Sequence, residues 1–107
     1  MKNSQNENPQ MQIDIDKIIH EPARLRLLAQ LFVVESADFI FLMRQTGLTQ
    51  GNVSGHLNKL EEAGYIDIIK GYSGKRPQTM VSMTTKGRQE FKKYIQNMKQ
   101  IFEGLKI

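Results

Sequence analysis

The chain has 107 residues, of which 39% are hydrophobic and 24% charged, and these values indicate one domain of the ordinary globular kind. It contains no cysteine, which excludes disulfides, thiolate catalysis and cysteine-based metal sites, and it has no apolar run of the length that crosses a bilayer. The polar residues 1–12, rich in Asn and Gln, predict a disordered tail with no apolar stretch suited to a signal peptide. We therefore expect a cytoplasmic protein whose folded part begins near residue 13.

The net charge of +4 is unevenly distributed along the chain. Residues 1–48 carry five basic and six acidic side chains, residues 49–83 carry four and three, and residues 84–107 carry six and two. A basic second half attracts polyanions, of which nucleic acid is the commonest. Taken alone this is a weak indication, because many proteins are mildly basic.

The first helix is expected after a proline. Residues 13–19 are expected to form a turn of helix, and Pro22 suits the first position of a new one. Leucines then recur at three- and four-residue spacing, which predicts a helix over Pro22–Val34 with Arg24 on its solvent side.

Two further helices are expected, joined by a tight turn. Ser36 or Asp38 caps the second helix, and Gly47 is placed to end it in a left-handed conformation. Thr49 caps the third helix, which Gly64 ends. The apolar positions of this third helix fall on one narrow face and are Val53, Leu57 and Leu60.

The pattern then changes from helical to alternating. Residues 65–70 are β-branched and aromatic and predict a strand, residues 79–83 predict the returning strand, and the Gly- and Pro-containing stretch between them predicts a turn. Thr84 is a suitable cap for a last helix from about Thr85 to Leu105. The order is three helices, a β-hairpin and a helix, so the predicted fold is α+β, mainly helical.

The third helix presents a bare outward face. With the apolar positions inward, Gly51 and Gly55 lie on one line, one turn apart, although each glycine costs a helix ~1 kcal/mol relative to alanine. Two such residues on an exposed stripe indicate that a partner approaches the backbone closely, as DNA does when a helix enters its major groove. The DNA-binding residues expected on this helix and its cap are Thr49, Gln50, Gly51, Asn52, Ser54, Gly55, His56, Asn58 and Lys59.

These side chains have different expected roles. Gln50 and Asn52 suit the reading of base edges, because an amide forms two hydrogen bonds with adenine. Phosphate contacts are expected of three further side chains, Ser54, His56 and Lys59. Glu62 would repel phosphate, so the end of the helix is expected to leave the groove.

A polar helix face is more often plain solvated surface, and a basic hairpin tip is more often a solvated loop. The prediction of DNA binding therefore depends on the combination of a short helix, a tight turn, a polar helix and a hairpin with a basic tip. On the hairpin, which we interpret as a wing on the DNA backbone or in the minor groove, the expected DNA-binding residues are Lys70, Tyr72, Lys75 and Arg76.

The stretch from Phe39 to Arg88, which contains GLTQGNVSGHLNKLEEAGYI, KGYSGKRPQT and MTTKGR, resembles the stand-alone winged helix-turn-helix transcription regulators related to the MarR and ArsR families. With HEPARLRLLAQL, which is similar to their first helix, the resemblance spans about residues 15–105. It implies a winged-helix fold, duplex DNA binding through Gln50–Lys59 and the wing at Lys70–Thr79, and dimerisation through the terminal helices. The absence of cysteine sets the chain apart from the thiolate metal sensors of the ArsR group.

Residues 84–107 are expected to form a dimerisation helix, after a winged helix-turn-helix DNA-binding domain at residues 13–83. Apolar residues recur there at intervals of four and three, an a/d heptad pattern. A helix of ~20 residues is ~30 Å long, more than the small domain covers, so packing against a second copy is expected, with folding back onto its own domain as the alternative. The expected interface residues are Phe91, Tyr94, Ile95, Met98, Ile101, Phe102 and Leu105. Lys86 and Arg88 are expected on its outer surface.

No catalytic constellation is found in the sequence. His20 with its acidic neighbours matches no common metal-ligand spacing, so no metal, cofactor or enzymatic activity is expected. The expected function is that of a homodimeric, sequence-specific, double-stranded DNA-binding transcription regulator; the alternative is a winged-helix module that docks a protein through the same face. The direction of regulation, the operator and any small-molecule effector stay open.

Overall fold

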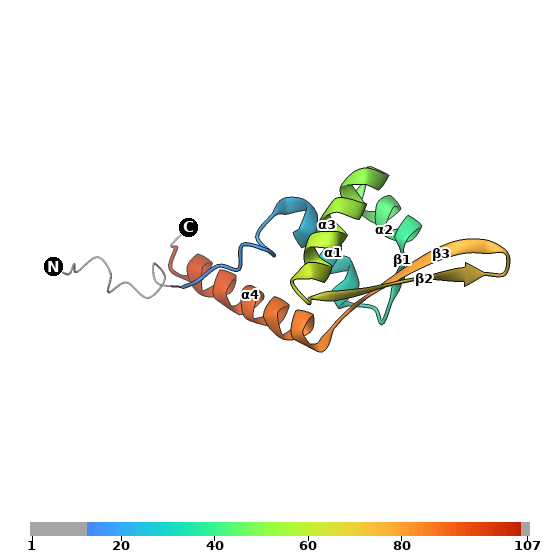
Figure 1. Cartoon of the computed structure of the whole chain (residues 1–107). Helices are drawn as coiled ribbons and strands as arrows, with labels where there is room; N and C mark the ends of the chain where they lie inside the picture. Colours follow the sequence, from blue (N-terminus) through green and yellow to red (C-terminus); the bar gives the residue numbers. More distant parts are fainter. Residues whose placement is uncertain (1–12, 106–107) are drawn as a thin grey trace.

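The computed structural model describes residues 13–105 (Figure 1). The predicted disordered tail, residues 1–12, lies outside the described residues. The elements in chain order are α1 (Pro22–Phe32), β1 (Ala37–Asp38), α2 (Phe39–Thr46), α3 (Gln50–Glu62), β2 (Ile66–Ser73), β3 (Arg76–Met83) and α4 (Thr85–Glu103). The strands form one antiparallel sheet in the order β1-β3-β2. The expected α+β winged helix-turn-helix fold is confirmed.

Polar cap residues begin the helices where the sequence predicts them. The N–H of Ile40 donates to the carboxylate of Asp38 at 2.7 Å, so Asp38 and not Ser36 caps α2. Thr49 caps α3 and Thr84 caps α4, the latter accepting from the N–H of Gly87 at 2.9 Å. Since these hydroxyl and carboxylate oxygens satisfy N–H groups that have no partner within the helix, the caps define where each helix starts.

The segment before α1 differs from its prediction. It contains an isolated turn at residues 17–19 instead of a turn of helix, and the carboxylate of Asp16 accepts from the N–H groups of Ile18 and Ile19 at 2.8 and 3.2 Å. The same carboxylate accepts from the hydroxyl of Tyr65 at 2.5 Å. An acidic side chain thus binds the local backbone, which competes with helix formation. The segment packs against the core.

The hairpin is longer than predicted because its turn is only two residues, Gly74 and Lys75, with Gly74 at φ +65°. A positive φ at the turn is what a two-residue hairpin loop requires. Pro77 therefore lies within β3, opposite Tyr72. The third strand, β1, has only two residues, too few for an alternating pattern, and the sequence did not predict it.

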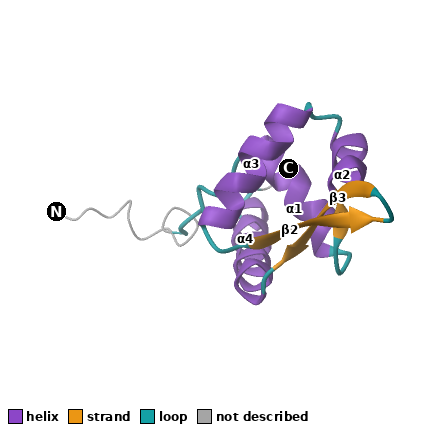
Figure 2. Ribbon diagram, turned by 45° about the vertical axis from the view of Figure 1, so that its right-hand side comes forward, coloured by secondary structure: helices purple, strands orange, loops and turns teal. Residues whose placement is uncertain are grey.

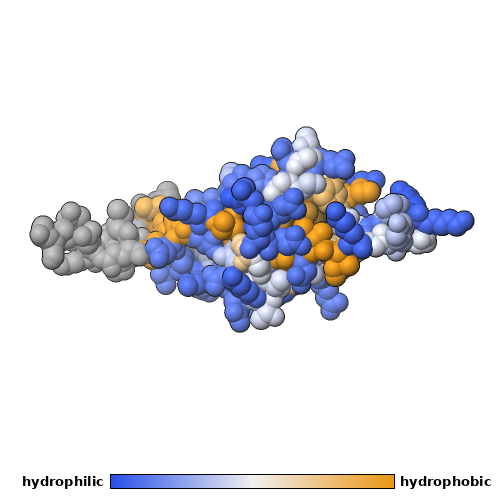
Figure 3. Space-filling model, viewed as in Figure 1, coloured by the Kyte–Doolittle hydropathy of each residue, from blue (hydrophilic) through white to orange (hydrophobic). Residues whose placement is uncertain are grey.

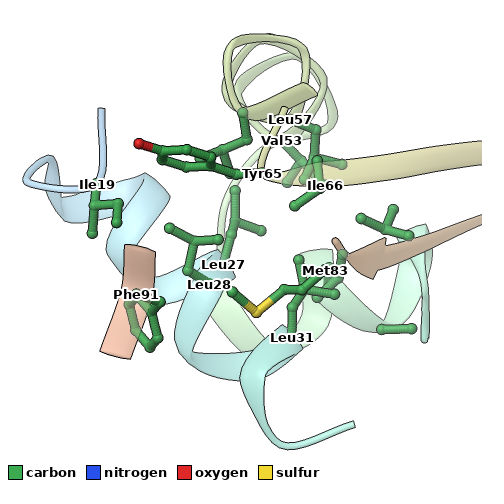
Figure 4. Packing of buried hydrophobic residues seen from close by; sticks show 14 of the residues in the cluster. Ile19, Leu27, Leu28, Leu31, Val53, Leu57, Tyr65, Ile66, Met83 and Phe91 are labelled. Carbon is green, nitrogen blue, oxygen red and sulfur yellow. The ribbon is translucent and has the colours of Figure 1, made fainter. Parts of the chain in front are cut away.

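The core is a single apolar cluster contributed by all four helices and the sheet. Figure 4 shows Leu27, Leu28 and Leu31 of α1 at its centre, with side chains of α3 and of the hairpin base around them. Each of these leucines is at most 1% exposed. Among residues 13–105, no helix is both long enough and apolar enough to pass through a membrane.

The start of α4 is fastened to the rest of the domain at two points. A Cβ added at Gly87 would lie 2.0 Å from the carbonyl oxygen of Tyr65, so the helix passes directly over that peptide. Arg88 donates to the carbonyl oxygens of Phe32 and Val34, both at 2.8 Å, at the C-terminal end of α1. The expectation that Arg88 lies on the outer surface is wrong, because its guanidinium bonds the last carbonyl of α1, that of Phe32, and the carbonyl of Val34 just beyond the helix.

The outer part of the hairpin projects from the body of the molecule. In Figure 2 the helices gather on one side of the sheet, and in Figure 1 the hairpin projects away from them on the side opposite to the far end of α4. Because β1 pairs only with Val81 and Met80 of β3, no third strand lies beside the outer half of the hairpin within the described residues 13–105. This outer half is therefore free to reach a partner.

Candidate nucleic-acid interface

A helix-turn-helix is formed by α2 and α3, which three residues connect, Gly47 to Thr49. Gly47 has φ +72° and its N–H donates to the carbonyl of Met43 at 2.9 Å, so the chain leaves α2 through a left-handed cap, as predicted. The apolar face of α3 is 0–1% exposed against the core. Its opposite face is therefore the one turned outward.

The outward face of α3 is open at both glycines. Gly51 and Gly55 are exposed, and a Cβ added at either position would have nothing within 4 Å apart from the helix itself. The stripe through these two residues is not covered by the domain's own core. A flat surface can therefore approach the α3 backbone closely.

Most of the predicted DNA-binding residues lie on exposed surface. Exposed are Thr49, Gln50, Gly51, Asn52, Ser54, Gly55, Asn58 and Lys59 on α3 and its cap, and Lys70, Tyr72, Lys75 and Arg76 on the hairpin. The hairpin end is hydrophilic in Figure 3. The two predicted groups lie on separate elements, and Gln50, Ser54 and Asn58 of the first group line the same hollow as Lys70 of the second.

His56 is placed differently, on the flank of α3 that meets α1. Its Nδ1 lies 3.2 Å from Nη1 of Arg24 and 3.8 Å from the carboxylate of Glu21, and the side chain is only 24% exposed. Arg24, predicted to face water, is half-buried and donates from Nε to the carbonyl of Ile18 at 2.5 Å. These contacts join α3 to α1, and they turn His56 away from the open stripe.

Glu21 lies beside both of these side chains. Its carboxylate caps α1 by accepting from the N–H of Arg24 at 2.8 Å. Burial alone would raise its pKa, but this hydrogen bond and the nearby charges of His56 and Arg24 outweigh burial and lower the pKa. The cluster is consistent with a structural contact between α1 and α3.

A groove of about 410 Å³ separates α3 from the hairpin. Gln50, Ser54 and Asn58 line its α3 side, and Lys70 and Thr79 line its hairpin side. Apolar side chains form part of its lining, among them buried Leu57. The groove thus combines a partly apolar floor with hydrogen-bonding edges.

Asp38 and Gln78 also line this groove; the sequence singles out neither side chain for the site, although Gln78 falls within the wing range Lys70–Thr79. Gln78 donates from Nε2 to the Asp38 carboxylate at 3.0 Å. This bond, together with the N–H of Ile40, lowers the pKa of Asp38. The sequence indicates only that Asp38 caps a helix and that Gln78 belongs to a turn. Nothing in the sequence pattern indicates that the two side chains meet.

His20 and the neighbouring Asp16 form hydrogen-bonding contacts within the protein. Nδ1 of His20 lies 2.9 Å from the hydroxyl of Tyr94, and Asp16 accepts backbone N–H groups. In the part of the chain that the structure describes, no three His, Asp or Glu side chains are grouped so as to hold a metal ion.

Comparison with known families identifies the chain. Residues 23–102 match the family model described as winged helix DNA-binding domain. The chain belongs to this family. An uncharacterized protein of Methanocaldococcus jannaschii is 36% identical over 89 residues, which cover 83% of this chain and 97% of that protein.

Two solved structures show the same architecture. A transcriptional regulator homologue from Pyrococcus horikoshii OT3 is 28% identical, with a TM-score of 0.82 over 92% of this chain and 94% of that one. BpsR of Bordetella bronchiseptica, whose DNA binding is regulated by 6-hydroxynicotinic acid, is 17% identical, with a TM-score of 0.64 over 89% of this chain and 67% of that one. The second likeness concerns the fold alone. The winged-helix regulator expected from the sequence is confirmed, and DNA is the partner that this family indicates.

Proposed function

We propose that this winged-helix protein is a homodimeric, sequence-specific regulator that inserts α3 into the major groove of duplex DNA. The observation that carries the proposal is the open stripe through Gly51 and Gly55, which lets base pairs approach the helix backbone. On this model Gln50 and Asn52 read base edges, because both amides are exposed in the first turn of α3. We place this function in the cytoplasm.

Ser54 and Lys59 are assigned to phosphates that flank the base-reading positions. Asn58 lines the hollow between α3 and the hairpin and is assigned to the DNA strand that passes there. His56 is left out of the proposed contacts because Arg24 and Glu21 engage its ring. A strand that leaves the major groove is proposed to pass along the α3 side of the hollow between α3 and the hairpin, beside Ser54 and Asn58. A small-molecule effector is not part of the proposal.

Changing both Lys75 and Arg76 to alanine is expected to weaken binding to every duplex alike and to reduce the salt slope. Both side chains are exposed at the hairpin end, where each can neutralise about one phosphate. The slope of log affinity against log salt should fall by up to ~2. Fluorescence anisotropy with labelled duplexes at several salt concentrations measures both quantities.

The same titration separates the two candidate functions. Binding of duplex DNA that weakens steeply with salt supports the proposal, whereas no DNA binding at low salt would favour the protein-docking alternative. A loss confined to one duplex sequence would show that the wing reads bases and would contradict its assignment to the backbone. A Gln96→Ala change on the exposed face of α4 is a control that should alter neither affinity nor slope.

The proposed dimer interface is the distal part of α4. Phe91 and Tyr94 are 4% and 6% exposed, and Phe91 packs on Phe32 with ring centroids 5.2 Å apart, so these two residues belong largely to their own domain. Phe102 and Leu105, by contrast, are 58% and 56% exposed. Hydrophobic surface is visible around this end of α4 in Figure 3.

A second copy is the proposed cover for this surface, with the half-buried Ile95, Met98 and Ile101 continuing it along the helix. Two copies held in this way would present two α3 helices to DNA. If these lie ~34 Å apart, they match successive major grooves on one side of the duplex, and the preferred site is a palindrome. Selection of bound duplexes from a random pool tests specificity and palindromy together.

A Phe102→Asp substitution is expected to shift the protein from dimer to monomer. A carboxylate in a buried apolar interface loses its hydration and finds no partner, which costs several kcal/mol. Sedimentation equilibrium should show at least about a hundredfold weaker association for a loss of roughly 3 kcal/mol. Gln96→Asp, on the exposed face of the same helix, is the matched control and should stay dimeric. A monomeric wild type, or a Phe102→Asp variant as dimeric as its control, would contradict the proposed interface.

A further inference from the structure

The hairpin is connected to the helix-turn-helix by one side-chain hydrogen bond at its root. Nε2 of Gln78, on β3, donates to Oδ2 of Asp38 at 3.0 Å, and the other oxygen of the same carboxylate accepts from the N–H of Ile40 at 2.7 Å. Asp38 is the cap of α2 and the last residue of β1. It is therefore rigidly held by the helix-turn-helix on one side and bonded to the hairpin on the other.

Among the described residues, the backbone pairing of β1 with β3 stops short of Gln78. Of the β3 residues that pair with β1, Met80 is the one nearest to the hairpin turn. Between the turn and Thr79, β3 pairs only with β2. Within residues 13–105, Gln78 to Asp38 is the only side-chain hydrogen bond recorded between this outer part of the hairpin and a helix or its cap. Gln78 thus lies two residues beyond the last β1 pair, where the hairpin begins to project.

The space on either side of the bond is hollow. One hollow of about 410 Å³ faces α3, and another of about 350 Å³ lies toward the hairpin turn. Asp38, Ile40, Pro77 and Gln78 line both. The start of α2 and the outer hairpin therefore meet between the two hollows, at these four residues, where the hydrogen bond lies.

The chemistry of the bond gives it a single orientation. A carboxylate only accepts hydrogen bonds, so it selects the Gln78 rotamer in which the amide nitrogen points to Asp38. Hydrogen bonds to the carboxylate from Gln78 and from the N–H of Ile40 lower the pKa of Asp38, because both stabilise its charged form. A hydrogen bond to a charged acceptor is stronger and shorter than one between neutral groups.

The projecting hairpin acts as a lever on this bond. Gly74 of the turn is four steps along the chain from Gln78, which at about 3.3 Å per residue gives an arm of about 13 Å. A rotation of about 10° at the root moves the end of such an arm by about 2 Å, more than the ~0.5 Å range that a hydrogen bond to phosphate tolerates. The angle at the root therefore sets where the backbone of Lys75 and Arg76 lies relative to a duplex bound by α3.

We propose that Gln78 is a positioning residue, which through Asp38 holds the wing at the angle to α3 that lets both engage one duplex. The inference rests on the proposed DNA-binding function and adds a residue that acts on the wing without touching DNA.

The first test is made on the free, full-length protein, without DNA. Backbone ¹⁵N relaxation should give order parameters of about 0.85 for Gly71 and Lys75 in the wild type, and values below about 0.6 in Gln78→Met, which keeps the length of the side chain but not its donor. Asp38→Ser should have the same effect, because serine still caps α2 but is too short to reach Gln78. Gln96→Met on α4 is the matched control and should leave the hairpin ordered.

The second test is a double-mutant cycle on DNA affinity. Gln78→Met should weaken binding about tenfold, the scale of losing most of the wing's phosphate contacts. In that background the change of Lys75 and Arg76 to alanine should cost little more, since residues that act through one element are not additive.

Three results would overturn the proposal: an equally ordered hairpin in Gln78→Met, unchanged DNA affinity in that variant, or full additivity, which would mean that Gln78 contacts DNA itself. A different result is loss of hairpin order in free Gln78→Met together with no DNA binding by the wild type. That result would refute the proposed function but would still support the role of the Asp38–Gln78 hydrogen bond in holding the hairpin. The two failures are therefore distinguishable.

Discussion

Replacing Gly87 with alanine is expected to destabilise the protein by about 3 kcal/mol or more, because the new methyl group has no room. A Cβ at this position lies 2.0 Å from the carbonyl oxygen of Tyr65 and 2.8 Å from its carbonyl carbon. The same oxygen accepts from the N–H of Thr84 at 3.0 Å, so the peptide cannot move without breaking the junction between β3 and α4. Out of a total stability of about 5–15 kcal/mol this is a large fraction.

Thermal unfolding at fixed protein concentration measures the effect. A loss of about 3 kcal/mol corresponds to a fall in Tm of at least about 12 °C for a domain of this size. Gly55→Ala is the matched control, since it makes the same change in another helix where nothing lies within 4 Å of the new Cβ. That variant should gain up to about 1 kcal/mol from helix propensity. Equal Tm values for the two variants would contradict the close packing of α4 on Tyr65.

Replacing Gly55 with leucine is expected to abolish specific DNA binding and to leave the fold intact. The position is exposed and surrounded by open space, so the domain accommodates the side chain. A leucine there would hold the α3 backbone away from the base pairs and break several contacts at once, each worth about 1–3 kcal/mol. The affinity for the selected duplex should fall by at least about a hundredfold.

Two controls make this result interpretable. Circular dichroism and thermal unfolding should show that Gly55→Leu keeps the wild-type fold, and sedimentation should show the same oligomeric state. Gly55→Ala should bind DNA more strongly than Gly55→Leu, because its methyl group intrudes less. DNA affinity equal to that of the wild type in Gly55→Leu would place the DNA-binding surface elsewhere and refute the assignment of α3 to the major groove.

The local elements were predictable because their signals are local. A cap residue before an apolar stripe determines where a helix starts, and Thr49 and Thr84 both act as the sequence predicts. The glycines that end α2 and follow α3 have positive φ, as a left-handed helix end requires. The candidate site was predictable to the extent that it consists of one helix face and one hairpin end.

Two side chains lie differently from what helical spacing predicts, because they contact distant parts of the chain. Arg88 has the spacing of a solvent-facing residue on α4, yet it bonds two carbonyls at the end of α1, 54 and 56 residues earlier. His56 has the spacing of a residue near the DNA-binding face, yet it meets Arg24, 32 residues earlier. Periodicity along one helix carries no information about which carbonyl or ring lies opposite a side chain.

The amino-acid sequence by itself determined the order of the elements, the limits of most helices and the bare stripe on α3, since each depends on residues within a few positions of one another. Only the tertiary structure decided that β1 joins the sheet, that Gly87 lets α4 cross the Tyr65 peptide, and that Asp38 holds Gln78. These features depend on the path of the backbone in space, because a hydrogen bond or a close approach needs both partners within a few ångströms, however many residues separate them.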